Sequence, residues 1–148
     1  FAMSKIVYDG EGVVFGRVAS RVAKDLLKGN DVDLINCEKM IISGDKKLFA
    51  KKILMKKDMG SGGSMKGPKY PRTPEKLVKR MIRGMLPRDR ARGRDAFRRL
   101  KCYSSGSEYA IDKGVEIIKP NTRKPMKFSS VAEVLKLIGA GKSLEGSK

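Results

Sequence analysis

The sequence contains no histidine, and only two of its 148 residues are cysteines, Cys37 and Cys102. Without histidine the commonest general acid–base group is missing, and two distant cysteines alone form no recognisable zinc site. We therefore expect no catalytic residue, no metal and no cofactor. Two cysteines are also too few for the disulfide framework of a small secreted protein. This favours an intracellular setting and two small buried thiols.

Acidic side chains are scarce, and long apolar runs are missing. The chain has 34 lysines and arginines against 16 aspartates and glutamates, a net charge of +18. This excess indicates nucleic acid or an anionic membrane surface as the partner. No apolar run approaches the about 20 residues of a membrane span, and no signal-peptide pattern opens the chain. With 40% hydrophobic residues, the chain is long enough for one globular domain, residues 1–148.

The positive charge is concentrated in the middle of the chain. Residues 1–45 have a net charge of −1, residues 46–65 of +5, residues 66–101 of +11 and residues 102–148 of +3. We call residues 66–101 the basic segment. Its arginines Arg88, Arg90, Arg92 and Arg94 occupy alternate positions, which lie on one face of an extended chain or on all sides of a helix. Neither arrangement leaves an apolar stripe for a core, so the charge density predicts binding to an external polyanion rather than a merely solvated face.

The first third of the chain has the clearest periodicity. Residues 6–8 and 32–35 are short apolar runs that predict strands. Between them, from Gly16 to Leu27, apolar residues recur at helical spacing and fill one half of a helical wheel. Gly29 and Asn30 then supply the left-handed stop that ends a helix. Strand, helix and strand over about thirty residues predict a βαβ unit and a parallel sheet.

Further elements follow with weaker signals. We expect a helix over residues 46–58, a Gly/Pro-rich loop from residue 59, and a helix capped by Thr73 with Leu77, Val78, Met81, Ile82 and Met85 on its inner face. We also expect a helix from Asp89 to Arg99, a final strand from Leu100 to Tyr103, and an extended stretch over residues 115–118. Ser130 and Glu133 form a capping box for a helix that ends at Gly139.

Three motif-like matches point to enzymes but fail on inspection. Gly10, Gly12 and Gly16 resemble a dinucleotide fingerprint, but Glu11 would face a pyrophosphate and bulky residues stand where a phosphate needs close approach, so a plain turn is favoured. The pair Tyr109 and Lys113 has the spacing found in short-chain dehydrogenases, in a chain too short for their fold. Residues 141–143 end like a phosphate-binding loop without its leading glycine.

The chemistry of the basic segment suits folded RNA. Lysine and arginine neutralise phosphates, and arginine adds bidentate hydrogen bonds and stacking. Tyr70, among lysines and Arg72, is a candidate for stacking on an exposed base, with ordinary packing as the alternative. The candidate RNA-binding residues are Lys56, Lys57, Lys66, Lys69, Tyr70, Arg72, Lys79, Arg80, Arg83, Arg88, Arg90, Arg92, Arg94, Arg98, Arg99 and Lys101.

The same stretch resembles a known family. The run GPKYPRTPEKLVKRMIRGMLPRDRARGRDAFRRLKCYSSG is similar to the signature region of the large-subunit ribosomal protein L13 family, above all in residues 83–87, Gly93–Arg94 and residues 100–103. The runs YDGEGVVFGRVASRVAKDLL and INCEKMIISG resemble its opening elements, and KGPKYPRTPEK resembles archaeal members. Cys102, where the family more often has a branched aliphatic residue, and the late Gly106 are mild departures.

The resemblance implies both a fold and a role. The implied fold is a three-layer α/β/α domain with a central four-stranded parallel sheet, basic loop and helical extensions, a core of about residues 4–106, and a C-terminal extension over 107–148 that packs on the core. The implied role is that of a structural, non-enzymatic constituent of the large ribosomal subunit in the cytoplasm. Its partners would be the large ribosomal RNA and neighbouring ribosomal proteins, with no membrane and no small-molecule substrate. A nucleotide-binding enzyme built on the Gly10–Gly16 turn and a generic basic adaptor remain the alternatives.

Overall fold

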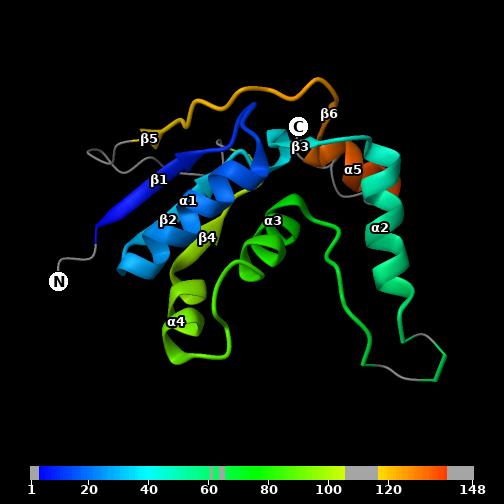
Figure 1. The fold of residues 1–148 in the computed structure, drawn as a ribbon, viewed down its shortest axis with the longest axis horizontal. Coiled ribbons are helices and arrows are strands. Elements are labelled where there is room, and N and C mark those ends of the chain that lie inside the picture. Colours follow the sequence, from blue (N-terminus) through cyan, green and yellow to red (C-terminus); the bar gives the residue numbers. More distant parts are fainter. Residues whose placement is uncertain (1–3, 61, 64–65, 106–116, 140–148) are drawn as a thin grey trace.

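The computed structural model describes residues 4–60, 62–63, 66–105 and 117–139. Its central sheet has four strands, β1 (Lys5–Asp9), β2 (Asp31–Ile35), β4 (Leu100–Cys102) and β5 (Ile117–Ile118), in the order β4-β2-β1-β5 (Figure 1). All three strand pairings are parallel, with Lys5 opposite Asp31 and Val32 opposite Leu100. The predicted four-stranded parallel sheet is therefore confirmed, and the arrangement of helices and sheet is consistent with the three-layer α/β/α prediction.

Helix α1 (Phe15–Lys28) connects β1 to β2 and completes the predicted βαβ unit. Its buried residues are Val18, Ala19, Val22, Ala23 and Leu26, while its basic residues face solvent. Gly29 ends the helix in the left-handed conformation, with φ of 104°, and its backbone N–H caps the last turn. The amphipathic pattern and the stop signal thus fix this helix as the sequence predicts.

Further helices pack on the same hydrophobic core as α1. The chain adds a 3-10 turn η1 (Cys37–Lys39), helix α2 (Lys46–Asp58), helix α3 (Pro74–Arg83), helix α4 (Ala91–Arg99) and helix α5 (Val131–Ile138). Side chains from α1, α3, α4 and α5 meet in one hydrophobic cluster together with Tyr8, Val32 and Leu34 of the sheet. On the other side of β1 and β2, Val7 and Ile35 form a smaller cluster with Tyr103.

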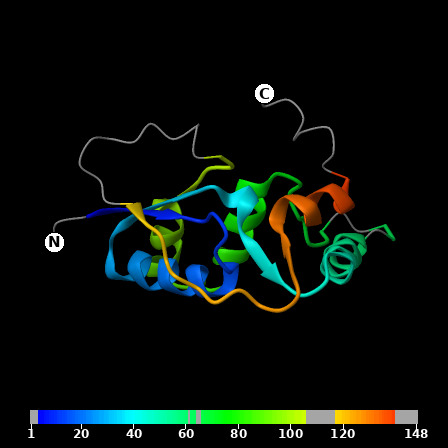
Figure 2. The same cartoon turned by 90° about the horizontal axis from the view of Figure 1, so that it is seen from above.

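A short antiparallel pair lies outside the main sheet. The apolar run at residues 40–42 contributes strand β3 (Ile41–Ser43), which pairs with β6 (Phe128–Ser130). Ser130 then caps α5, because its side-chain oxygen accepts a hydrogen bond from the backbone N–H of Glu133, and Gly139 ends the helix with φ of 96°. In Figure 2 the segment before β6 runs along the lower edge of the view from β5 and reaches β3 near the middle of the molecule.

Four details differ from the sequence-based expectations. Met85 is 43% exposed because α3 ends at Arg83, and Leu86 takes the buried position in its place. Thr73 has the backbone geometry of an N-cap, but its side-chain oxygen is buried without a hydrogen-bond partner. Helix α4 begins at Ala91 and not at Asp89, and β4 is not the final strand, because β5 pairs with β1 at the far edge of the sheet.

Candidate nucleic-acid interface

Along the chain, the basic segment follows β2 and ends in β4, and these two strands are neighbours in the sheet. It leaves the loop that follows α2, forms α3 and α4, and ends in β4, which pairs with β2 (Figure 1). In Figure 1, α2 and α4 lie on opposite sides of α3 and extend away from the sheet. The pairing of β4 with β2 therefore ties the end of the basic segment to the centre of the fold.

The outer surface of α3 gathers cations and aromatic rings. The Arg80 guanidinium lies over the ring of Tyr70, 5.0 Å from its centroid, and Lys79 lies 5.2 Å from the centroid of Phe97. Partial burial, and then the positive charges of Arg80 and Arg88, lower the pKa of Arg83 from its usual value. The crowding of like charges predicted from the sequence is thus present in space, at the end of α3.

Tyr70 is half-buried and packs against the hydrophobic core. The Arg80 guanidinium lies over this ring and also donates a hydrogen bond to the backbone oxygen of Lys69 at 3.5 Å. Ordinary packing, the alternative to base stacking, therefore describes Tyr70 in the free protein. Stacking of Tyr70 on a base stays a prediction.

A close backbone contact shapes the turn that carries the alternating arginines. A Cβ atom placed on Gly93 would lie 2.0 Å from the backbone oxygen of Pro87 and 3.1 Å from the backbone nitrogen of Arg88. Only glycine lets α4 approach the turn this closely. Within the turn, the backbone N–H of Arg90 donates to the Pro87 oxygen at 3.2 Å. Gly93 therefore sets where the side chains of Arg88 and Arg90 leave the backbone.

Two of the predicted RNA-binding arginines hold the end of α1. Arg92 donates a hydrogen bond to the backbone oxygen of Leu27 at 2.9 Å, and Arg99 donates to that of Leu26 at 2.8 Å. Both oxygens belong to the last turn of α1, and that of Leu26 also accepts the capping N–H of Gly29. The two guanidiniums therefore add charged donors at this end and complement the helix dipole. Arg99 is half-buried, and its Nε atom is buried without a partner. Arg92 and Arg99 thus contribute to the fold in addition to any role with RNA.

The acids of the basic segment neutralise few of its arginines. Asp95 pairs with Arg98 at 3.5 Å, and Arg94 donates to the backbone oxygen of Asp89, not to its carboxylate. The side chains of Arg88 and Arg90 are exposed and form no hydrogen bond or ion pair with any residue that the structure describes. Their charge is consequently available to an external anion.

The remaining predicted residues are spread along the surface. They are exposed and lie on the last turn of α2, in the following loop and in β4; they are Lys56, Lys57, Lys66, Lys69, Arg72 and Lys101. Lys101 lines a hollow of about 360 Å³ between α3 and the end of β4, together with Lys76, Lys79 and Glu75. The fold thus groups the candidates of α3, its preceding turn and α4, whereas Lys56 and Lys57 lie on a separate helix.

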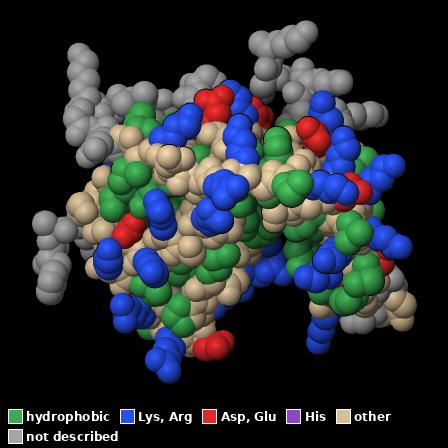
Figure 3. All heavy atoms as spheres, turned by 45° about the horizontal axis from the view of Figure 1, so that its top comes forward, with side chains coloured by type: hydrophobic (Ala, Val, Ile, Leu, Met, Phe, Trp, Pro, Cys, Tyr) green, Lys and Arg blue, Asp and Glu red, His purple; other side chains and the backbone are tan. Residues whose placement is uncertain are grey.

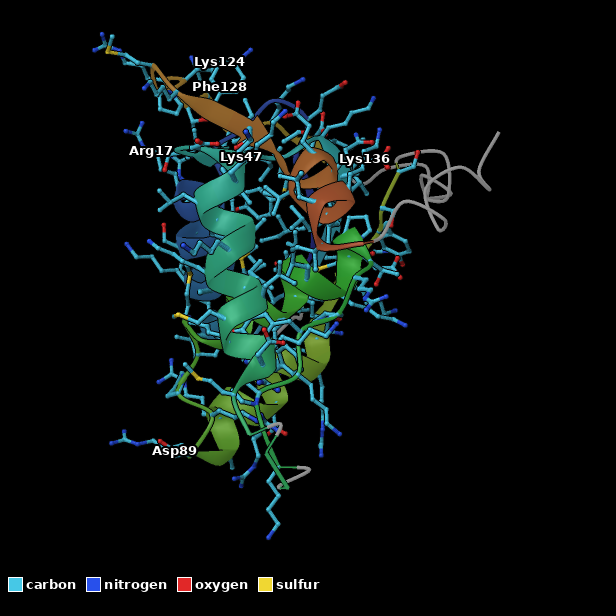
Figure 4. The ribbon with its side chains drawn as sticks, turned by 90° about the vertical axis from the view of Figure 1, so that its right-hand side faces the viewer. Arg17, Lys47, Asp89, Lys124, Phe128 and Lys136 are labelled. Atoms are coloured by element: carbon cyan, nitrogen blue, oxygen red, sulfur yellow. The ribbon has the colours of Figure 1, made fainter. Side chains whose placement is uncertain are left out.

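Part of the basic surface lies outside the basic segment and has no counterpart in the sequence-based candidates. Arg17 at the start of α1 lines a hollow with Arg123 and Lys124, which precede β6. Figure 4 shows Arg17 and Lys124 at one end of the molecule and Asp89 of the basic segment at the other. The signal that could have found this surface is the run KPNTRKPMKF at residues 119–128, in which four cations are interspersed with prolines, a methionine and a phenylalanine.

The turn at Gly10 does not provide a phosphate-binding loop. Each backbone N–H from Gly10 to Val14 donates to an atom of the protein itself, with acceptors in Ile35, Asp9, Lys39, Gly10 and Thr122. A phosphate cradle needs free amides pointing at the ligand, so this turn is structural. The other two motif matches, at residues 109–113 and 141–143, lie outside the described residues.

Within the described ranges, no group of three or more histidine, cysteine or acidic side chains could hold a metal ion. None of the helices in those ranges combines the length and the apolar content needed to cross a bilayer.

The chain is similar in sequence to known proteins of one family. The profile of the family described as Ribosomal protein L13 matches residues 4–109. The large ribosomal subunit protein uL13 of Archaeoglobus fulgidus is 39% identical over 137 residues, which cover 90% of this chain and 86% of the relative. The protein of the same name from Methanosphaera stadtmanae is 39% identical over 139 residues, or 90% of this chain and 96% of the relative. That of Methanosarcina barkeri is 46% identical over 98 residues, or 66% and 69%.

Proposed function

Because the chain belongs to the ribosomal protein L13 family, whose members are structural and not enzymes, we propose that it is a constituent of the large ribosomal subunit. The proposal includes binding of folded large-subunit rRNA through the basic segment, contacts with neighbouring ribosomal proteins, and a cytoplasmic location as part of the ribosome. The archaeal relatives support an archaeal type of ribosome as its setting.

One observation carries the RNA-binding part of the proposal. Arg88 and Arg90 lie on an exposed turn, and neither pairs with a carboxylate of the residues that the structure describes. Arg80 and Arg83 add further positive charge nearby. Clustered guanidiniums that repel one another destabilise the free protein, and phosphates remove that repulsion when they bind. Phosphate is also the anion whose geometry matches the planar guanidinium.

The salt dependence of RNA binding tests this proposal. With deproteinised large-subunit rRNA of Archaeoglobus fulgidus as the probe, about eight neutralised phosphates at about −0.7 each give a log–log slope on the order of −6. The double variant Arg88→Gln, Arg90→Gln should bind more weakly and with a slope smaller in magnitude by about 1.4. A slope near −1 for the unaltered protein would show that the arginines are mostly solvated.

A charge-matched control separates specific contacts from net charge. Lys24 and Lys136 are exposed on α1 and α5, outside the basic segment. The variant Lys24→Gln, Lys136→Gln removes the same two charges, and we expect its slope to stay within error of the unaltered protein. Equal losses in both double variants would mean that only overall charge attracts the RNA.

A further inference from the structure

Residues 119–128, which we call the strap, cross the molecule from β5 to β6 without forming a helix or strand before Phe128 (Figures 1 and 2). The strap is nevertheless held along its length. Its anchors are an ion pair between Lys119 and Asp9 at 3.7 Å, a hydrogen bond from the Val14 N–H to the Thr122 hydroxyl at 3.1 Å, and one from the Gly44 N–H to the Lys127 oxygen at 2.9 Å. These contacts hold the strap at its start, at Thr122 and at its end.

The end of the strap turns apolar side chains outward and a polar one inward. Ser129 is buried, and its hydroxyl donates to the Gly44 oxygen at 3.1 Å. Its neighbour Phe128 is 51% exposed, and Met126, two positions earlier, is fully exposed. Successive strand residues alternate between faces, and the pairing of Phe128 with Ser43 fixes this register. The aromatic ring is thus held at the surface by the sheet.

Positive charge surrounds these apolar side chains. Met126 lines two hollows of about 410 and 390 Å³, one on the side of α2 and α5 and one on the side of α1. The charged residues that line the hollows are five cations, Arg17, Lys46, Arg123, Lys124 and Lys127, and two acids, Asp45 and Glu133. Both acids are engaged, because Asp45 caps α2 and Glu133 pairs with Lys46 at 3.3 Å. Figure 3, which brings the top of Figure 1 forward, shows apolar side chains among lysines and arginines, with acids interspersed.

We infer that the strap is a second RNA-binding surface, on which Phe128 stacks against an unpaired base while Arg123, Lys124 and Lys127 bind the flanking phosphates. The inference rests on the proposed function. An exposed aromatic ring among cations is the combination that binds single-stranded nucleotides, because stacking and phosphate neutralisation act together. The centre of a protein–protein contact is depleted in lysine, which makes a protein a poorer match to this surface.

The strap and the basic segment are separate surfaces. Figure 4 places Phe128, Lys124 and Arg17 at the end of the molecule opposite Asp89. Since both surfaces are fixed to one core, binding at one places the other at a defined distance along the RNA and raises its effective concentration. The protein would then hold two separate RNA segments together, one on each surface.

The test compares variants of the full chain on the same deproteinised rRNA of Archaeoglobus fulgidus. We expect Phe128→Ser to weaken binding by about five- to 150-fold, the range for one stacked base. Its salt slope should not change, because no charge is lost, and Phe128→Tyr should restore affinity. Circular dichroism and thermal unfolding of each variant check that the half-exposed position leaves the fold intact.

Two mapping readouts identify the contact. Ultraviolet cross-linking should attach a nucleotide to the tryptic peptide of residues 128–136, which begins with Phe128. Chemical footprinting should show that Phe128→Ser and the Arg88→Gln, Arg90→Gln variant each lose protection of a different RNA segment.

Any of three other outcomes would overturn the inference. If the protein binds and Phe128→Ser behaves as the unaltered chain, the strap is not an RNA surface while the proposed function stands. If Lys124 and Lys127 cross-link to another protein of a reconstituted subunit and no nucleotide attaches to residues 128–136, the strap binds protein. If the unaltered chain does not bind the rRNA at all, the proposed function and the inference both fail.

Discussion

Replacing Gly93 by alanine should destabilise the protein, although alanine is the better helix former. The added methyl group would lie 2.0 Å from the backbone oxygen of Pro87, at least 1 Å closer than side-chain Cβ atoms approach other atoms. The clash involves backbone on both sides, so no flexible side chain can give way. Helix α4 and the turn at Pro87 must therefore move apart, and the contact that places Arg88 and Arg90 is lost.

The size of the effect follows from two opposing contributions. Inserting a methyl group into a packed contact costs about 1–3 kcal/mol, and a backbone clash belongs at the upper end. Replacing glycine by alanine in a helix gains up to about 1 kcal/mol. We therefore expect a net loss of about 1–2 kcal/mol in the free energy of unfolding, which lowers the urea midpoint by about 0.5–1 M.

Gly16 offers a matched control, since it also lies in the first turn of a helix and a Cβ atom there would meet nothing within 4 Å. Gly16→Ala should stabilise the protein by about 0.4–1 kcal/mol. Urea unfolding followed by circular dichroism measures both variants. If Gly93→Ala is as stable as Gly16→Ala, the close approach of α4 to Pro87 is not a feature of the folded protein, and the reasoning fails.

Three further predictions concern stability. Arg99→Gln should lower the free energy of unfolding by about 1–2 kcal/mol, because it removes a charged hydrogen bond to the Leu26 oxygen; calorimetry that finds no loss would contradict the role of Arg99 at the end of α1. Burial, and then the hydrogen bond to Asp25, raise the pKa of Tyr8 to about 12. The protonated side chain therefore stabilises the fold fully below pH 10, and this contribution is lost as the pH rises to about 12. Urea titrations between pH 9 and 12 should show this loss in the unaltered protein and not in Tyr8→Phe. Val22→Asp places a carboxylate in the fully buried centre of α1 and should abolish cooperative unfolding, whereas a folded variant would show that α1 does not pack as described.

The elements that the sequence predicts well are those with a local cause. Helix α1 follows from its apolar periodicity and from Gly29, and α5 follows from the Ser130 cap and Gly139. The parallel pairing of β1 and β2 follows from the intervening helix, because a crossover connection leaves few alternatives. The charge concentration in the basic segment is also a local property, and the structure brings Arg80, Arg83 and Arg88 close together.

The features that the sequence does not predict depend on distant partners. Two isoleucines, Ile117 and Ile118, form an edge strand only because β1 offers a free side, and nothing near them specifies that pairing. Arg92 and Arg99 look like their neighbours in the sequence, but only the packing of α4 on the end of α1 brings them to its carbonyls. The strap is hidden for a similar reason, since residues 102–148 have a net charge of only +3 and its surface includes Arg17 from another part of the chain.

The pairing of β4 with β2 has a consequence for synthesis on the ribosome. Val32 lies opposite Leu100, so 67 residues separate two paired positions of neighbouring strands, and β5 joins the other edge later still. Every arginine up to Arg99 is therefore translated before the sheet can acquire its third strand. During that interval β1 and β2 have unpaired edges, which can pair with other nascent chains, and a polyanion that engages the emerging cations would keep those chains apart.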